Sequence, residues 1–290
     1  MKIKDGIEIL RPLNCLMGSL TVLIGILNTR VGVETPTLII NIVLGLITYF
    51  FIAGSGNVIN DYYDIEIDKI NRPDRPIPRG SITLKQAMIW WIISALIGLV
   101  IAIIHGLLFI LGFLNIIIAL FMVFIGWLYA VWGKKNGFIG NIIVSVSFSI
   151  GLVYGAILNS SNIPYYIYFF FLTSFFLLLS REIIKGCEDI EGDKNEGVKT
   201  LAIKIGIEKS TKISMIFGIF AIVFFILPFF TEIINHVFFL ISMFFGLGVV
   251  CYAVIIMMKR NLEREDFKKV SLILKLGAYL GLIAFLFASF

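Results

Sequence analysis

Long apolar runs alternate with short polar segments along the whole chain, and this pattern predicts membrane-spanning helices. A span needs about 20 mostly apolar residues, and nine runs approach or exceed that length. The predicted spans are residues 12–29, 37–59, 86–105, 107–131, 138–158, 164–184, 213–230, 236–258 and 272–289. We therefore expect an all-α, polytopic membrane bundle of nine transmembrane helices, built as a single domain over residues 1–290.

Composition agrees with this fold class and narrows the chemistry. The chain is 59% hydrophobic and 15% charged, whereas a soluble domain carries about 25% charged residues. Cys15, Cys187 and Cys251 are widely spaced and form no C-x-x-C motif. The only histidines, His105 and His236, are predicted at the outer ends of spans. A disulfide framework, a thiolate metal site and haem or zinc chemistry are therefore not expected.

Positive charge predicts the orientation of the bundle. With nine spans, one side receives the N-terminus and the segments 60–85, 132–137, 185–212 and 259–271. Together with the adjoining span ends, these segments contain every Lys and Arg except Arg30, and the opposite loops "HG", "NSSNIP" and "TEIINH" contain none. The positive-inside rule makes that side, and the N-terminus, cytoplasmic. We expect a multi-pass protein of the cell membrane whose charge of +5 does not indicate nucleic acid.

The opening segment and a short internal repeat add two expectations. "MKIKDGIEILRPLN" is too charged to be a cleaved signal peptide. "DIEIDKIN" at 64–71 and "DIEGDKN" at 189–195 align without gaps, 125 residues apart, after the second and the sixth predicted spans. Four spans separate them, so both copies point the same way. This predicts two parallel four-helix halves and a ninth helix, with a site where the halves meet.

The repeated segments carry rows of oxygen ligands at helical spacing. Asn60, Asp64 and Asp68 form one row, with Asp61 beside it, and Asp189 and Asp193 form the other. Facing carboxylates repel unless a cation lies between them. Oxygen ligands without a soft ligand suit Mg²⁺, which is usually completed by water and substrate phosphates. The sequence thus predicts Mg²⁺ and a phosphorylated substrate.

Basic side chains near these rows are candidate phosphate ligands. Arg72, Arg75 and Lys185 are expected to bind the phosphate of that substrate, and Tyr129 with Lys134 ends the fourth span on the same side. Arg79, Lys194, Lys199 and Lys204 add further positive charge. The alternative interpretation is a solvated face with i,i+4 pairs such as Asp68 with Arg72, and topogenic lysines at Lys134 and Lys135.

"NDYYDIEID" with "NRPDRP", followed by "REIIKGCEDIEGD", resembles the UbiA superfamily of intramembrane prenyltransferases. That family carries an N-D-x-x-D-x-x-x-D motif after its second helix and a D-x-x-x-D motif after its sixth, in a nine-helix bundle. The resemblance implies that both motifs bind Mg²⁺ and the diphosphate of an isoprenoid donor. It also implies a bundle that holds the isoprenoid tail.

Within the superfamily, "REIIKGCED" is more similar to the branch of archaeal digeranylgeranylglyceryl phosphate synthases than to the branch that acts on 4-hydroxybenzoate. The resemblance implies transfer of a geranylgeranyl group from geranylgeranyl diphosphate to the glycerol hydroxyl of geranylgeranylglyceryl phosphate. The phosphate on this acceptor suits Arg79, Lys194, Lys199 and Lys204, which exceed what one diphosphate needs. An aromatic, quinone or chlorin acceptor is the alternative. The chain departs from the family pattern in two places. The branch often has an acidic residue after the lysine of this motif, whereas Gly186 and Cys187 follow Lys185. The family pattern Tyr-x-x-x-Lys is offset, because Lys134 lies five residues after Tyr129.

The expected mechanism assigns roles to these residues. Asp64 and Asp68 with Asn60 or Asp61 hold one Mg²⁺, and Asp189 with Asp193 hold another. Arg72, Arg75 and Lys185 stabilise the leaving diphosphate, and the general base is left open between a carboxylate and the diphosphate itself. A CDP-alcohol phosphatidyltransferase lacks support because no D-G-x-x-A-R signature is present. A transporter would need ionisable residues inside the spans, which are nearly free of them. The sequence does not indicate an oligomeric state.

Overall fold

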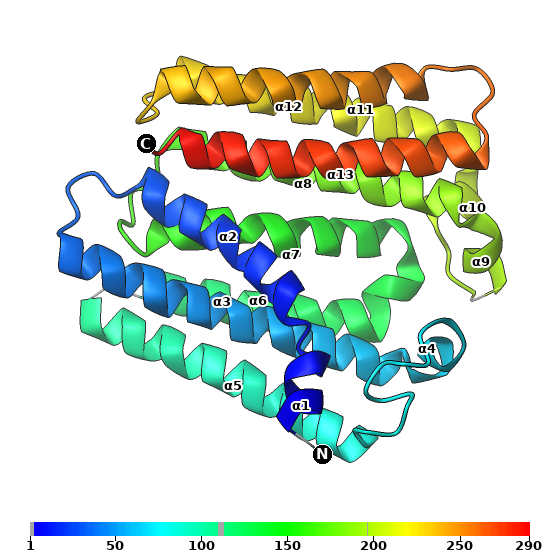
Figure 1. Cartoon of the computed structure of the whole chain (residues 1–290), viewed down its shortest axis with the longest axis horizontal. Helices are drawn as coiled ribbons and strands as arrows, with labels where there is room; N and C mark the ends of the chain where they lie inside the picture. The colour runs from blue at the N-terminus through cyan, green and yellow to red at the C-terminus, as the bar shows by residue number, and fades with distance from the viewer. Residues whose placement is uncertain (1–2, 110–112, 196) are drawn as a thin grey trace. The chain divides into compact units, whose positions relative to one another are not determined.

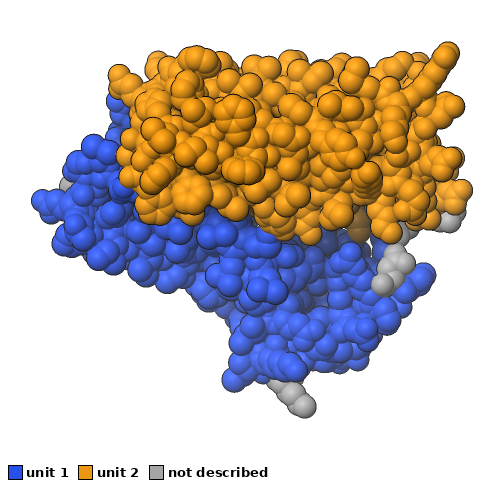
Figure 2. All heavy atoms as spheres, turned by 45° about the horizontal axis from the view of Figure 1, so that its top comes forward, with its two compact units in different colours: residues 1–132, 154–163 blue, residues 133–153, 164–290 orange. Residues whose placement is uncertain are grey.

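The computed structural model describes residues 3–109, 113–195 and 197–290, and all the regular secondary structure in them is helical. The chain divides into two compact units, coloured separately in Figure 2. Unit 1 comprises residues 1–132 and 154–163, and unit 2 comprises residues 133–153 and 164–290. The predicted all-α class is therefore confirmed.

Unit 1 contains the first helices of the chain. They are α1 (Ile3–Ile9), α2 (Pro12–Asn28), α3 (Thr35–Tyr63), α4 (Ile65–Asn71), α5 (Leu84–Phe109) and α6 (Leu114–Leu128). α3 is the central element, because α1, α2, α4, α5 and α6 all contact it. α6 continues into a π-helical turn, Tyr129–Gly133, and a 3₁₀ turn, Lys134–Asn136.

The remaining helices lie wholly or mostly in unit 2. They are α7 (Phe138–Ile157), α8 (Tyr165–Glu188), α9 (Ile190–Asn195), α10 (Leu201–Ile205), α11 (Ile207–Ile226), η3 (Leu227–Phe230), α12 (His236–Met257) and α13 (Arg264–Phe287). α8 contacts α9, α10, α11 and α13, and α12 contacts α11 and α13. α8 therefore has the central place in unit 2 that α3 has in unit 1 (Figure 1).

Eight helices among the described residues are long and apolar enough to cross a membrane. α1 and α2 together pass the same test as a pair bent by 51°, which raises the number of candidate spans to nine. Their order follows the predicted spans. The nine-span topology, the cytoplasmic N-terminus and the single domain remain predictions.

The predicted outer turn at His105 and Gly106 is wrong. Both residues lie inside α5, which continues to Phe109, and α6 begins at Leu114. His105 is tolerated inside the helix because it is fully buried and its Nε2 is 2.8 Å from Oδ1 of Asn41 on α3. In the sequence, a polar residue that forms a hydrogen bond to a neighbouring helix therefore looks the same as a loop residue.

The end of α7 is held in unit 1 by close contact with α2. A Cβ on Gly155 would lie 2.1 Å from the carbonyl oxygen of Val22, so only glycine allows this approach. Asn159 Nδ2 donates to the carbonyl of Ile26 at 2.8 Å, and Asn41 Nδ2 donates to the carbonyl of Leu158 at 2.8 Å. These bonds satisfy polar backbone groups that a membrane interior would leave unpaired.

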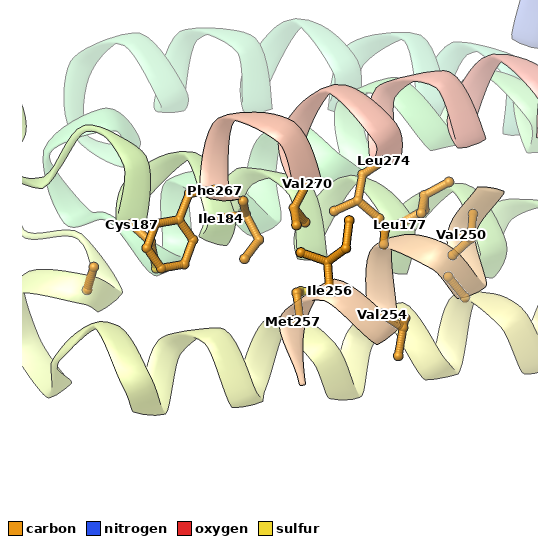
Figure 3. Packing of buried hydrophobic residues seen from close by; sticks show 13 residues of the cluster. Leu177, Ile184, Cys187, Val250, Val254, Ile256, Met257, Phe267, Val270 and Leu274 are labelled. Carbon is orange, nitrogen blue, oxygen red and sulfur yellow. The ribbon is translucent and has the colours of Figure 1, made fainter. Parts of the chain in front are cut away.

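In unit 2, an apolar cluster supports the carboxyl end of α8. Ile184 and Cys187, which precede Asp189, pack with Phe267 and Val270 of α13 and with Met257 of α12 (Figure 3). Between membrane helices such a cluster stabilises by close van der Waals packing rather than by removal of apolar surface from water. Packing against α12 and α13 therefore fixes the backbone that carries the second acidic motif.

Candidate active site

The first acidic motif lies where α3 ends and α4 begins. Asp64 interrupts the helix with φ −90° and ψ 5°. Its N–H still donates to the carbonyl of Asn60 at 3.0 Å, and the N–H of Asp68 donates to the carbonyl of Asp64 at 2.8 Å. The four-residue hydrogen-bond spacing therefore persists through the break.

The three aspartates of this end are buried. Asp61, Asp64 and Asp68 are 2%, 6% and 4% exposed. Two like charges about 4 Å apart repel by about 4 kcal/mol at an effective dielectric constant near 20. Such a cluster is stable only with cations or strong donors beside it, so its partners determine what it can do.

Two arginines and one amide supply those partners. Asp61 Oδ1 accepts from Arg11 Nη2 and, at 3.1 Å, from Arg75 Nη1. The same Arg75 nitrogen donates to Asp68 Oδ2 at 2.5 Å. Asn60 Nδ2 donates to Asp64 Oδ2 at 2.8 Å. The structure thus brings together Asn60, Asp61, Asp64, Asp68 and Arg75.

Arg11 is a residue of this end that sequence reasoning missed. It lies at the 51° bend between α1 and α2, directly before Pro12, with φ 53°. A non-glycine residue in this conformation costs of order 1–3 kcal/mol and persists only where its surroundings fix it. The available signal was a cation placed between the apolar Leu10 and Pro12, at the start of the first span.

Arg79 is not spare charge for a second phosphate. Its Nη2 donates to Asp5 Oδ1 at 2.7 Å and its Nη1 donates to Glu8 Oε1 at 2.8 Å. The hydrogen bond to Glu8 is the largest of the effects that raise the pKa of Arg79 above its ordinary value. Arg79 therefore ties α1 to the loop after α4, because two acids of the opening segment neutralise it. Arg72, by contrast, is exposed and forms no ion pair with the residues that the structure describes.

The second acidic motif repeats the backbone of the first but not its surroundings. Asp189 interrupts the chain between α8 and α9 with φ −106° and ψ 22°. Its N–H donates to the carbonyl of Lys185 at 3.0 Å, and the N–H of Asp193 donates to the carbonyl of Asp189 at 2.9 Å. The Asp189 side chain is 53% exposed and lies 3.9 Å from Nη2 of Arg264. Asp193 is half-buried.

The other predicted basic residues lie near the second motif or in the other unit. Lys185 Nζ is 3.2 Å from Oε2 of Glu182, so an acid already holds it on α8. The turn that contains Lys134 lies beside the segment after α9, because the N–H of Lys199 donates to the carbonyl of Lys135 at 3.3 Å. Tyr129 is half-buried and belongs to unit 1, so its joint role with Lys134 remains a prediction.

The donor set of the first end fits a hard divalent ion. Among the described residues, no three side chains from His, Cys, Asp and Glu form a group that could hold a metal ion. Asn60 Oδ1, however, is a buried acceptor without a hydrogen-bond partner, in the same row as Asp64 and Asp68. Mg²⁺ typically takes one or two carboxylates and completes its shell with water and phosphate. These residues therefore fit Mg²⁺ together with a substrate.

Asp61 is the poorest position for such an ion, because it faces two guanidinium groups, whereas Asp68 faces only that of Arg75, through Oδ2. A divalent cation on Asp61 Oδ1 would meet the Arg11 and Arg75 guanidinium groups that already donate to that oxygen. A double and a single positive charge about 4 Å apart repel by about 8 kcal/mol at an effective dielectric constant near 20.

Comparison with known proteins identifies the family. Residues 19–285 match the model of the UbiA prenyltransferase family. The chain belongs to this family. It is therefore a prenyltransferase and a multi-pass membrane protein, in agreement with the resemblance of its two aspartate motifs.

Relatives and solved structures match the chain from end to end. Digeranylgeranylglyceryl phosphate synthase of Thermococcus sibiricus is 37% identical over 100% of this chain and 98% of the relative. The protein of the same name from Methanosphaera stadtmanae is 34% identical over 96% and 97%. A solved structure of digeranylgeranylglyceryl phosphate synthase in membranes has TM-score 0.84 at 32% identity and covers 99% of this chain and 98% of its own. A UbiA homolog from Archaeoglobus fulgidus, bound to GPP and Mg²⁺, shares the fold with TM-score 0.71 at 18% identity, over 97% of this chain and 99% of its own.

Proposed function

We propose that this prenyltransferase moves a geranylgeranyl group from geranylgeranyl diphosphate to the glycerol hydroxyl of geranylgeranylglyceryl phosphate. The product carries the second ether bond of an archaeal membrane lipid. The observation that carries the proposal is the full-length match to relatives named for this synthesis, at 34% and 37% identity. The buried acidic end of α3 supplies the matching chemistry.

Mg²⁺ is the cofactor that this donor set favours. Asn60, Asp64 and Asp68 would hold one ion, and Asp189 with Asp193 would hold another. When bound, Mg²⁺ neutralises charge that develops on a leaving diphosphate. The protein's own contribution is to hold these oxygens in rows of fixed spacing, since both rows keep the four-residue backbone hydrogen bonds.

The basic residues bind and orient the leaving group. Arg75 is held in place by Asp61 and Asp68 through Nη1, and its Nη2 and Nε donors form no ion pair with the described residues. Arg72, exposed beside it, and Lys185, on α8, add positive charge. Preorganised cations stabilise the departing diphosphate more than the intact ester, which is what acceleration requires.

The proposed reaction breaks the allylic C1–O bond, and the bonding electron pair leaves with the diphosphate. The acceptor hydroxyl oxygen attacks C1 and forms the ether bond. Its proton goes to a carboxylate or to the departing diphosphate. Apolar helices around the isoprenoid tail keep water from the allylic centre, because attack by water would give the free alcohol.

The proposal includes its cellular setting. We infer that the protein has nine spans with a cytoplasmic N-terminus, and that the acidic ends of α3 and α8 lie at the cytoplasmic face of the cell membrane. The abundance of Lys and Arg in the segments after both helices supports this orientation. The substrates are an isoprenoid diphosphate and a lipid phosphate, both of which reach the enzyme from the bilayer.

The test is transfer by the purified protein in nanodiscs, with labelled geranylgeranyl diphosphate and a panel of acceptors, with and without Mg²⁺. We expect Mg²⁺-dependent product only with geranylgeranylglyceryl phosphate. Asp64→Asn should abolish it, and the matched control Glu66→Gln should not, because Glu66 is an exposed acid of the same motif. Product with an aromatic acid but never with the glyceryl phosphate would overturn the choice of acceptor, and full turnover in excess EDTA would overturn the metal.

A further inference from the structure

Asp61 is the most buried acid of the first motif, and it forms ion pairs with two arginines. It is 2% exposed, and a single carboxylate oxygen, Oδ1, accepts from Arg11 and from Arg75. The two arginines come from opposite sides of α3 in sequence, one from the bend before α2 and one from the loop after α4. Asp61 is therefore the point at which these two segments are joined.

We propose that Asp61 is a positioning residue that clamps Arg11 and Arg75 beside the ion-binding row, and that it is not itself an ion ligand. The proposal rests on the proposed function, because the clamped guanidinium groups serve a diphosphate. It assigns a role to Arg11, and it separates the second residue of the "NDYYD" motif from Asn60, Asp64 and Asp68.

Three observations on the N-terminal segment support a built clamp. Arg11 adopts φ 53° before Pro12, a conformation that its surroundings must hold. Arg79 fastens α1 to the loop after α4 through Asp5 and Glu8. An apolar cluster that includes Ile9 and Leu10 of the N-terminal segment, Val58 of α3, and Ile77 and Ile82 of the loop fills the space between the same segments. Packing and ion pairs therefore fix both arginines relative to α3.

The clamp leaves donors for an anion. A guanidinium has five N–H donors in a planar fork that matches phosphate oxygens. Arg75 uses one nitrogen, Nη1, for its contacts with both Asp61 and Asp68, and Arg11 uses Nη2 for its contact with Asp61. Asp61 thus orients each guanidinium group and leaves its other N–H donors for an anion.

A ligand role for Asp61 predicts the opposite behaviour. If Asp61 held the ion, Arg11 would compete with the ion for Oδ1. Removing Arg11 would then tighten ion binding, whereas removing the Asp61 charge would weaken it. If Asp61 is a clamp, the two changes weaken the same property, diphosphate binding, and leave ion binding to the row of Asn60, Asp64 and Asp68.

The experiment measures ion and anion binding without turnover. Mn²⁺ is titrated into the purified protein and followed by electron paramagnetic resonance, and inorganic diphosphate is titrated calorimetrically in excess Mg²⁺. For Arg11→Gln and Asp61→Asn we expect about tenfold weaker diphosphate binding each, the loss of roughly one charge-assisted hydrogen bond. The double variant should bind diphosphate no more weakly than the single variant that has the lower affinity, because the two residues act as one unit.

The Mn²⁺ titration distinguishes the clamp role of Asp61 from a ligand role. Half-saturation should stay within about threefold of the wild type in Arg11→Gln and Asp61→Asn, and should rise by about tenfold or more in Asp64→Asn, which removes a ligand charge. Arg11→Lys should recover part of the diphosphate affinity, since it restores the charge but not the fork. Glu66→Gln is the matched control, with the same loss of charge at an exposed position.

Two results would overturn the clamp: tighter Mn²⁺ binding in Arg11→Gln, or a loss of Mn²⁺ binding in Asp61→Asn equal to that in Asp64→Asn. Size-exclusion profiles and thermal melting identify variants that do not fold. In that case Arg11→Lys and Asp61→Glu, which keep both charges, replace them, and diphosphate affinity unchanged in both would contradict the clamp. Absence of prenyl transfer by the wild type would remove the proposed function but leave these binding results interpretable.

Discussion

The carboxyl ends of α3 and α8 share a backbone and differ in their surroundings. Each helix is interrupted at the first aspartate of the repeated segment, Asp64 or Asp189, and each preserves the hydrogen bond to the carbonyl four residues earlier. In the first end Asp61, Asp64 and Asp68 are buried, and Arg75 pairs with Asp68 at 2.5 Å and with Asp61 at 3.1 Å. In the second, Asp189 is half exposed and its arginine is 3.9 Å away.

The difference has a specific origin in the segments that follow. The loop after α4 carries Arg72, Arg75 and Arg79, whereas the positions 125 residues later hold Gly197, Thr200 and Lys204. The position that corresponds to Arg11 holds Asn136, in the turn that bonds to Lys199 through Lys135. In each unit the repeat therefore brings a turn next to the loop that follows the acidic motif, but only in unit 1 do these two segments carry arginines.

This comparison teaches that the first end is preorganised and the second is not. Buried charges in fixed pairs need no rearrangement when a substrate arrives, whereas an exposed carboxylate is hydrated and screened by salt. We therefore expect the first end to dominate stability and ion affinity, and the second to contribute once the donor is bound.

The largest expected effect is on turnover. Asp64→Asn and Asp189→Asn should each lower transfer by about a thousandfold, because each removes charge next to the leaving diphosphate. Product formation from labelled geranylgeranyl diphosphate measures this. The matched controls are Glu66→Gln and Glu191→Gln, exposed acids that correspond to each other in the repeat.

The outcome decides whether the two ends are functionally equivalent. Controls should stay within about threefold of the wild type, as surface substitutions usually do. If Asp189→Asn kept wild-type turnover while Asp64→Asn lost it, the repeat would be a feature of the backbone alone, and only the buried end would catalyse.

The second effect is on stability and should appear at one end only. Asp61→Ala leaves the Arg11 and Arg75 guanidinium groups without their shared partner, and breaking a buried pair in this way costs about 3–5 kcal/mol. Asp189→Ala removes an exposed, distant pair, which is worth about 0–1 kcal/mol. Thermal unfolding of the detergent-solubilised protein compares them. Equal destabilisation by both substitutions would contradict the burial contrast.

The helices and the motif rows were predictable because hydrophobic runs and four-residue spacing are local properties. The predicted spans ended at 59 and 184, but α3 continues to Tyr63 and α8 to Glu188. Hydropathy marks the segment inside the bilayer, whereas backbone hydrogen bonds define where the helix ends, and in both helices they continue past the apolar run.

What the sequence could not predict depends on contacts between distant residues. Arg11 and Asp61 are 50 residues apart, and nothing in "ILRPLN" indicates an acidic partner. Arg79 was expected to bind phosphate, because Asp5 and Glu8 belong to an opening segment that hydropathy treats only as charged. His105 was assigned to a turn because its partner, Asn41, lies 64 residues earlier.

The third effect is stabilisation by ligand. Mg²⁺ with inorganic diphosphate should stabilise the wild type by about 2.7 kcal/mol when the ligand is present at a hundred times its dissociation constant. Asp64→Asn should lose this stabilisation, and Asp189→Asn should keep part of it if the first end binds the ion by itself. Melting temperatures with and without EDTA measure both. Equal loss in the two variants would mean that neither end binds the ion alone.

The smallest effect concerns the arginine at each end. Arg264→Gln should change the free energy of unfolding by about 0.5 kcal/mol or less, since Arg264 and Asp189 are both exposed and 3.9 Å apart. Arg75→Gln should cost several times more, because it leaves Asp61 and Asp68 buried with one donor fewer. Unfolding at low and high salt separates the two, since screening weakens only the exposed pair. A salt-sensitive loss in Arg75→Gln as small as that in Arg264→Gln would show that water reaches the first end as readily as the second, and the preorganised site would then have no physical basis.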